Sequence, residues 1–341
     1  MPLFRFRFRA MGSPCELQLH GPSRDGLEGL ARRCTREVAR LEVKYSRYRE
    51  DSLASAIARS AGDDEGVLVD DETAALLDFA QTAWRESDGR FDPTSGVLRR
   101  VWDFRSNRLP DPAALAEVRT LVGWSKLRWE RPRLVLPIPG MQLDFGGFVK
   151  EYAADRVAGL CREAGLASGL IDLGGDLAVV GPHPDGSPWL VGIRHPRCPD
   201  RPIARIALAS GGIATSGDYE RCMIVDGVRH SHLLDPRTGE SFRGGPASVS
   251  VAAPLCLIAG SATTIAMLHP AQASERFLAD LGLPHLVIHA DGRVAGDADV
   301  VSAGAADPAN GDPDRGDRPR SAYDRDEKTT RSASQPSSPS R

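Results

Sequence analysis

Hydrophobic and polar positions alternate along the first twenty residues. Aromatic residues are separated by arginines over 3–9, and apolar residues alternate with polar ones again over 15–19. A period of two is typical of a strand with one buried face. We therefore expect an N-terminal β-hairpin with its turn near Met11 and Gly12.

Further along the chain the apolar spacing changes to three and four residues, which is typical of helices with one buried face. The first such stretch covers 27–41, and a second begins after the capping residues 70–72 and stops at 88–89. Asp111-Pro112 opens a third helix, with proline at its first position. Three more helices are predicted over 149–160, 255–268 and 272–281.

Short apolar runs bounded by glycine, proline or charged turns predict the strands. The run over 141–145 enters a Gly146-Gly147 turn, and the run over 170–173 enters Gly174-Gly175 before another strand. The remaining predicted strands cover 126–130, 133–136, 189–194, 203–208, 248–252, 285–289 and 293–295. Helices and strands in this order indicate an α+β fold with a mixed sheet.

The densest group of polar residues lies in two adjoining segments, 211–222 and 229–239. The second segment carries His230 and His232. Asp226-Gly227 between the segments is a strong hairpin signal, so both polar groups should lie at the same end of a β-hairpin. Any single one of these residues could serve the hairpin alone, whereas the whole constellation points to a ligand site.

Composition limits the classes of protein to which this chain can belong. The 341 residues are 41% hydrophobic and carry a formal net charge of −3, so the chain has no basic field of the size that nucleic acids require. The six cysteines form no C-x-x-C pair, and no apolar run is long enough to span a bilayer. Without an apolar leader the chain is expected in the cytoplasm, unless its true start lies upstream. We expect one domain over 1–303 and, from the Asp, Pro, Arg and Ser content, a disordered tail over 304–341.

Three glycine pairs, at 146–147, 174–175 and 211–212, each lie beside a carboxylate or a hydroxyl. Glycines let the backbone approach a ligand closely, and free amides at such turns bind phosphate oxygens, so these turns suit a ligand with more than one phosphate. The motifs G-x-x-x-x-G-K-[ST], G-x-G-x-x-G, G-x-S-x-G and H-E-x-x-H are absent from the sequence. The residues alone indicate a site for a phosphate-bearing cofactor, without saying which cofactor.

Two segments resemble signatures of a known family, the FAD:protein FMN transferases or ApbE-like flavin transferases. These are ATSGDYER over 214–221 and HLLDPRTG over 232–239. Further segments follow the family's order: Met11-Gly12, Ser46–Ser52 (S-x-Y-x-x-x-S), Phe91–Leu98 (F-D-x-T-x-G-x-L) with Trp102–Phe104 (W-x-F), Leu143–Asp155 (L-D-x-G-G-x-x-K-x-Y-A-x-D) and Asp172–Asp176 (N-L-G-G-D). The resemblance covers residues 3–295.

The resemblance implies a single catalytic domain of two lobes with the flavin nucleotide in the cleft between them. Such an enzyme transfers the FMN moiety of FAD to a threonine or serine hydroxyl of an acceptor flavoprotein and releases AMP. Catalytic roles are implied for His232, as base or orienter of the hydroxyl, and for Asp176. The implied FAD contacts are Met11, Tyr48, Phe91, Asp92, Asp144, Lys150, Thr215 and Leu234.

The resemblance also implies Mg²⁺, which would neutralise pyrophosphate charge and be held by the Gly147 carbonyl, Thr263 and Thr264. Many members carry A-D-A-x-x-T where this chain has Ala259–Thr264, so Gly260 replaces a carboxylate that binds the cation. We therefore expect weakened Mg²⁺ binding, because this hard ion prefers carboxylate oxygens. Three further departures are Ala58 near an asparagine of the family, Glu151 for a glycine, and Asp172 for an asparagine.

Two other functions fit the same residues. Attack by water instead of a protein hydroxyl would make the chain an FAD pyrophosphatase, and a non-catalytic flavin-binding module would leave FAD intact. Purely structural roles also stay open for single residues: a hairpin turn for Met11-Gly12, cover at a helix end for Tyr48, an N-cap for Asp92 and a structural imidazole for His232.

Overall fold

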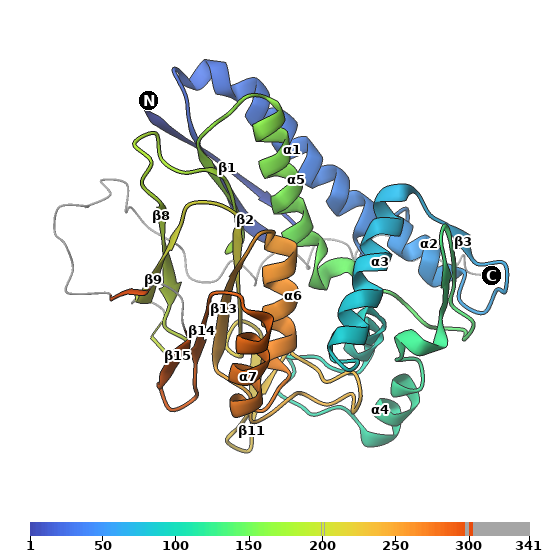
Figure 1. Cartoon of the computed structure of the whole chain (residues 1–341). Coiled ribbons are helices and arrows are strands. Elements are labelled where there is room, and N and C mark those ends of the chain that lie inside the picture. Colours follow the sequence, from blue (N-terminus) through green and yellow to red (C-terminus); the bar gives the residue numbers. More distant parts are fainter. Residues whose placement is uncertain (199, 201, 297–299, 303–341) are drawn as a thin grey trace, which may run out of the picture. The chain divides into compact units, whose positions relative to one another are not determined.

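An eight-stranded sheet is the largest element of the computed structural model, which describes residues 1–198, 200, 202–296 and 300–302 (Figure 1). The predicted tail over 304–341 lies outside these residues. The strand order is β1-β2-β6-β7-β10-β13-β14-β15. The strands are β1 (Leu3–Ala10), β2 (Ser13–His20), β6 (Gly169–Leu173), β7 (Asp176–Gly181), β10 (Gly212–Gly217), β13 (Ser248–Ala253), β14 (His285–Ile288) and β15 (Val294–Gly296).

Each pairing within this sheet is antiparallel among the residues that the structure describes. The predicted α+β class is confirmed, and the predicted mixed sheet is corrected to an antiparallel one. The connections explain the difference, because a hairpin lies between β10 and β13, and two successive helices lie between β13 and β14. Each of these connections returns the chain to the sheet in the opposite direction, whereas parallel neighbours need a single crossover connection.

The remaining described strands form smaller sheets. One has the order β16-β9-β8, a second is the hairpin β11-β12, and a third has the order β3-β5-β4. Their bounds are β3 (Val67–Leu68), β4 (Arg128–Glu130), β5 (Arg133–Val135), β8 (Trp189–Arg194), β9 (Pro202–Leu208), β11 (Cys222–Val225), β12 (Val228–Ser231) and β16 (Val300–Ser302). Trp189 and Ile206 are buried against Val179 and Leu286, so the β8–β9 pair covers one face of the large sheet.

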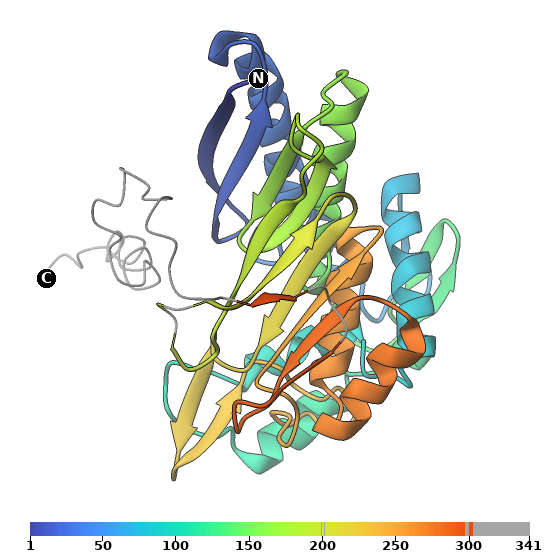
Figure 2. The same ribbon diagram turned by 60° about the vertical axis from the view of Figure 1, so that its left-hand side comes forward.

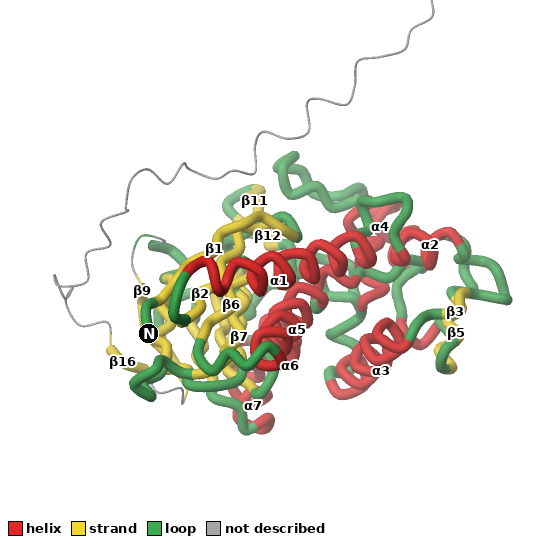
Figure 3. Tube along the Cα trace, turned by 90° about the horizontal axis from the view of Figure 1, so that it is seen from above, coloured by secondary structure: helices red, strands yellow, loops and turns green. Residues whose placement is uncertain are grey.

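Four helices pack on the opposite face: α1 (Arg24–Tyr45), α5 (Val149–Glu163), α6 (Cys256–Met267) and α7 (Ala271–Leu281) (Figures 1 and 3). Successive side chains of a strand point to opposite faces. Val249 and Val251 of β13 accordingly pack with α6, whereas Ala252 packs with β8 and β9. Figure 2 shows the strands as one layer with α6 and α7 beside it.

The remaining helices connect β2 to β6. They are α2 (Leu53–Arg59), α3 (Asp71–Glu86), α4 (Pro112–Arg119) and the 3₁₀ turns η1 (Pro93–Arg100), η2 (Trp124–Lys126) and η3 (Phe145–Gly147). Asp70 accepts a hydrogen bond from the Thr73 amide at 3.0 Å, and Asp111 accepts one from the Ala114 amide at 2.9 Å. These caps confirm the predicted starts of α3 and α4. Throughout the described ranges, no helix combines the length and apolar character that crossing a membrane requires.

The segment over 141–145 is not the strand that its apolar pattern predicts. The Asp144 amide donates to the Pro93 carbonyl at 2.9 Å, and the Asp144 carboxylate accepts from the Gly146 amide at 2.9 Å, which starts η3. Met141 and Phe145 are buried nonetheless. Apolar residues thus reach the core here without a strand partner, and α5 follows as predicted.

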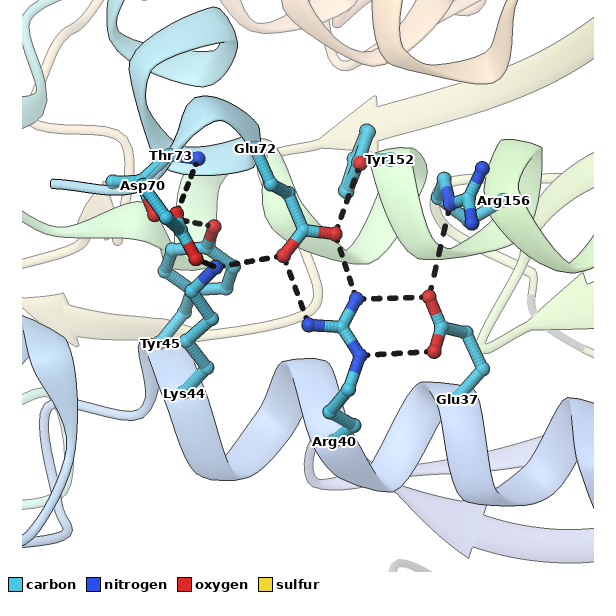
Figure 4. A network of polar contacts seen from close by, with 9 residues as sticks. All are labelled: Glu37, Arg40, Lys44, Tyr45, Asp70, Glu72, Thr73, Tyr152 and Arg156. Carbon is cyan, nitrogen blue, oxygen red and sulfur yellow. Dashed lines mark hydrogen bonds and ion pairs between the residues drawn. The ribbon is translucent and has the colours of Figure 1, made fainter. Parts of the chain in front are cut away.

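A polar network joins α1 to α3 and α5 (Figure 4). Arg40 and Lys44 of α1 pair with Glu72 of α3 at 2.6 and 2.7 Å. Tyr152 of α5 donates to the same carboxylate at 3.1 Å. The network holds α5 in place immediately after residues 150–151, which lie in the candidate site.

Candidate functional site

The hairpin β11–β12 brings the two polar segments together, as the Asp226-Gly227 signal predicts. Both turn residues have positive φ, +50° and +75°, which is the conformation of a tight hairpin turn. Cys222 pairs with Ser231, and beyond them the His232 amide donates to the Arg221 carbonyl at 2.8 Å. The ends of both segments therefore meet beside His232.

The imidazole of His232 is uncharged at neutral pH. Its pKa falls to about 4, first because burial disfavours the charged ring and then because Arg99 and Arg221 add positive charge. Its Nδ1 is buried and has no hydrogen-bond partner in the described part of the chain. A neutral ring nitrogen without a partner can accept a proton or a hydrogen bond from a bound group.

A buried ion pair joins α5 to β7. Lys150 Nζ lies 2.7 Å from an oxygen of Asp176, whose side chain is 8% exposed. Burial works against the ammonium charge of Lys150, but the carboxylates of Asp176 and Glu151 outweigh it and raise the Lys150 pKa. Lys150 thus keeps its positive charge, paired with the Asp176 carboxylate at the start of β7.

The N-terminal hairpin adjoins this pair. Met11 and Gly12 have φ of +51° and +71°, and they form a two-residue turn between Ala10 and Ser13. A Cβ added at Gly174 would lie 2.6 Å from Ser13 Cβ and 3.6 Å from Lys150 Nζ. Only glycine lets the 174–175 turn pass this close to Ser13 of the N-terminal hairpin. Met11, Lys150 and Asp176 therefore come from distant parts of the sequence into one region.

The glycine pair at 211–212 has a packing role. A Cβ at Gly212 would lie 2.6 Å from the Cys256 amide nitrogen, and one at Gly211 would lie 2.3 Å from the Ala253 carbonyl oxygen. The strand β10 therefore needs glycines here to pass the start of α6. This close packing accounts for the glycines at 211–212 without a ligand, and a part of this turn in a phosphate site stays a prediction.

Asp144 and Tyr48 are linked by an arginine. Arg47 donates to an Asp144 carboxylate oxygen at 2.6 Å and to the Tyr48 hydroxyl at 2.7 Å, and its guanidinium lies 4.8 Å from the centre of the Tyr48 ring. Tyr48 is 81% exposed. Arg99 of η1 approaches the same Asp144 carboxylate at 3.7 Å. This cluster therefore combines one carboxylate with two guanidinium groups beside an open aromatic ring.

Sequence reasoning missed Arg47 and Arg99. Arg47 lies inside the recognised segment Ser46–Ser52, and Arg99 directly follows Leu98, where another recognised segment ends. Guanidinium groups bind phosphate oxygens with fixed geometry, so arginines next to expected ligand contacts were the available signal.

Phe91 and Asp92 are engaged within the protein. Phe91 is buried with its ring 5.8 Å from that of Phe148. Asp92 caps η1 by accepting from the Thr94 amide at 2.8 Å, and its other oxygen accepts from the Trp124 amide at 2.8 Å. The N-cap alternative thus describes the contacts of Asp92, and a direct contact of either residue with flavin stays a prediction.

Hydroxyl groups gather where β10 meets α6. Thr215 Oγ1 lies 2.7 Å from the Ser250 hydroxyl, and Ser216 Oγ lies 2.9 Å from Thr263 Oγ1. Thr263 donates to the Gly260 carbonyl at 2.8 Å, and the half-buried Thr264 follows it on α6. Of the other predicted residues, Gly147 is exposed at the entrance to α5, and Leu234 forms a bridge with Ser241 beyond β12.

Groups of three or more His, Cys, Asp or Glu side chains placed to hold a metal are absent within the described ranges. A cation at this site would therefore depend on hydroxyl, carbonyl and substrate oxygens together with few carboxylates. Hard ions such as Mg²⁺ accept such mixed oxygen ligands.

Two curated proteins that this chain resembles in sequence carry the name FAD:protein FMN transferase. A Treponema pallidum protein called FAD:protein FMN transferase is 32% identical over 279 residues, which are 76% of this chain and 77% of that protein. A Salmonella typhimurium protein of the same name is 31% identical over 230 residues, 64% of this chain and 66% of that protein.

Solved structures agree with these relatives. The crystal structure of the ApbE protein from Thermotoga maritima matches with a TM-score of 0.79 at 28% identity, over 87% of this chain and 97% of that chain. Flavin transferase ApbE from Vibrio cholerae matches with a TM-score of 0.77 at 26% identity and the same coverage. The model of the ApbE family matches residues 11–287, which is more than half of the chain. The chain belongs to the ApbE family.

Proposed function

We propose that this protein transfers the FMN moiety of FAD to a threonine or serine hydroxyl of an acceptor protein and releases AMP. The observation that carries the proposal is the neutral His232 imidazole, with its unpartnered Nδ1 beside Arg99 and Arg221. A neutral imidazole that can accept from and orient a hydroxyl, next to fixed positive charges, suits phosphoryl transfer to that hydroxyl. The names of the curated relatives support the same reaction.

FAD would bind across the clusters described above. The residues proposed to contact it are Met11, Tyr48, Phe91, Asp92, Asp144, Lys150, Thr215 and Leu234, with Arg47 and Arg99 added from their contacts. Tyr48 offers an exposed aromatic face to the flavin ring. Lys150 and the two arginines offer positive charge to the pyrophosphate.

In the reaction, the acceptor oxygen forms a bond to the FMN-side phosphorus. The bond from that phosphorus to the bridging oxygen breaks, AMP leaves with the bridging oxygen, and the hydroxyl proton passes to His232. Lys150 stays charged because Asp176 lies 2.7 Å away, so it can stabilise negative charge that grows on the leaving phosphate. Asp176 acts by holding Lys150 in position.

The residues present also fit a divalent cation. Oε2 of Glu151 is buried without a hydrogen-bond partner in the described part of the chain, and it belongs to α5 where that helix meets α6. The Gly147 carbonyl, Thr263 and Thr264 would supply further oxygen ligands. When bound, Mg²⁺ would neutralise pyrophosphate charge.

Intact-mass measurement of an acceptor flavoprotein tests the proposal. The protein is incubated with FAD, Mg²⁺ and a candidate acceptor, and AMP is measured in parallel. An acceptor heavier by one FMN moiety, with matching AMP, is expected, and replacement of the target threonine by valine should abolish the gain. Free FMN with AMP and no labelled acceptor would instead indicate hydrolysis, and intact FAD with acceptors of known competence would indicate a binding module.

A further inference from the structure

The Glu151 side chain lies where a side chain of residue 260 would begin, although 109 positions separate the two residues in the sequence. A Cβ built on Gly260 would lie 2.6 Å from Glu151 Cγ, 2.7 Å from its Oε1 and 2.9 Å from its Cδ. Cβ atoms are not found this close to neighbouring heavy atoms, so a side chain at 260 would force the Glu151 side chain out of the position it holds here. The Glu151 carboxylate fills the space in which a side chain of residue 260 would begin.

The Glu151 side chain is buried, with one of its two carboxylate oxygens unpaired among the described residues. It is 9% exposed, and its Oε2 makes no hydrogen bond within the described ranges. The neighbouring cation, Lys150, is engaged with Asp176 at 2.7 Å. Burying a polar oxygen without a partner is costly, and a bound cation beside this carboxylate would offset that cost.

The oxygens proposed as cation ligands come from segments that adjoin Glu151 in the fold or in the sequence. Gly260, Thr263 and Thr264 share one face of α6, because residues three and four apart are neighbours on a helix. Thr263 donates to the Gly260 carbonyl at 2.8 Å, so its hydroxyl lies on the turn of α6 that the Glu151 side chain approaches. Gly147 lies four residues before Glu151 at the entrance to α5. One carboxylate among hydroxyl and carbonyl oxygens is the ligand chemistry of a hard divalent cation.

We propose that Glu151 is the carboxylate ligand of the divalent cation, reaching from α5 into the place that a side chain at 260 would take on α6. This assignment rests on the proposed function for the presence of the cation. It gives two departures from the family pattern, Glu151 and Gly260, a single explanation. The carboxylate ligand comes from α5 instead of α6. It also replaces the sequence-based expectation of a site with no protein carboxylate.

Mn²⁺ binding tests the assignment without measuring activity. Mn²⁺ is titrated into the protein with and without FAD, and the free ion is followed by electron paramagnetic resonance. Glu151→Gln keeps the shape of the side chain and should weaken Mn²⁺ binding by about tenfold or more, as expected for loss of a charged ligand. Glu163→Gln, at the exposed end of the same helix, is the matched control and should bind as the natural protein does.

A reciprocal exchange makes the test specific. Glu151→Gly should lose Mn²⁺ affinity, and Glu151→Gly combined with Gly260→Asp should recover it to within about threefold of the natural protein, because the carboxylate returns from the other helix. Gly260→Asp alone should give no tighter binding, since its Cβ would meet Glu151. Melting temperatures of all variants establish that each is folded.

The assignment is overturned if folded Glu151→Gln binds Mn²⁺ as the natural protein does, if the double variant binds no better than Glu151→Gly, or if the natural protein binds no Mn²⁺. Failure of the proposed function has a different signature. In that case the acceptor gains no FMN, whereas Mn²⁺ binding still depends on residue 151.

Discussion

Acid should destabilise this protein through His232. The pKa of this imidazole is about 4 in the folded protein and 6.5 as an ordinary histidine. The folded state therefore binds fewer protons than the unfolded state below pH 6.5, so the contribution of His232 is fully present above 6.5 and is lost as the pH falls toward 4. Replacing His232 by glutamine removes this dependence while keeping a polar side chain.

The two pKa values set the magnitude. Integrating proton binding between pH 7 and pH 5 gives a loss of about 2 kcal/mol in the free energy of unfolding, rising to about 3 kcal/mol near pH 4. Other titrating groups contribute as well, but they are common to the natural protein and to His232→Gln. The difference between the two proteins therefore isolates the imidazole.

Urea unfolding at pH 7 and pH 5 measures this difference. The natural protein should lose about 2 kcal/mol more than His232→Gln between the two values. Replacing Arg99 by glutamine should reduce that loss, because the Arg99 charge is one cause of the low pKa. A change equal in both proteins to within about 0.5 kcal/mol would refute a neutral, desolvated His232.

Three further outcomes are expected. His232→Ala should slow FMN transfer while the calorimetric affinity for FAD stays nearly constant, as for a group acting in the chemical step, and full transfer activity would leave His232 a structural residue. Tyr48→Ala should weaken flavin binding by about 1–2 kcal/mol with no change in the urea midpoint, since this ring is 81% exposed; an unchanged dissociation constant would remove Tyr48 from the site. Lys150→Met should lower the free energy of unfolding by about 3 kcal/mol by leaving Asp176 buried without its cation. Adding Asp176→Leu should restore most of that loss, and equal urea midpoints for the single and double variants would contradict it.

Local features of the fold follow from the sequence. The alternation over 3–19 predicts β1 and β2, Asp70 and Asp111 predict two helix starts, and Asp226-Gly227 predicts the hairpin β11–β12. Each of these signals acts over a few residues, because capping, turn formation and the alternation of side chains are properties of neighbouring positions. Family motifs add the residues proposed for the site, including Lys150 and His232.

Tertiary structure alone decides which distant residues meet. Sequence patterns are silent on the antiparallel return of β13 and β14. They also predict a strand over 141–145, where the structure has a stretch without regular secondary structure that leads into η3. Read along the chain, Gly260 is a missing carboxylate and Glu151 an unrelated change. Their shared space, within 2.6 Å, comes from the packing of α5 on α6, since the spacing of residues along a sequence holds no record of which helices touch.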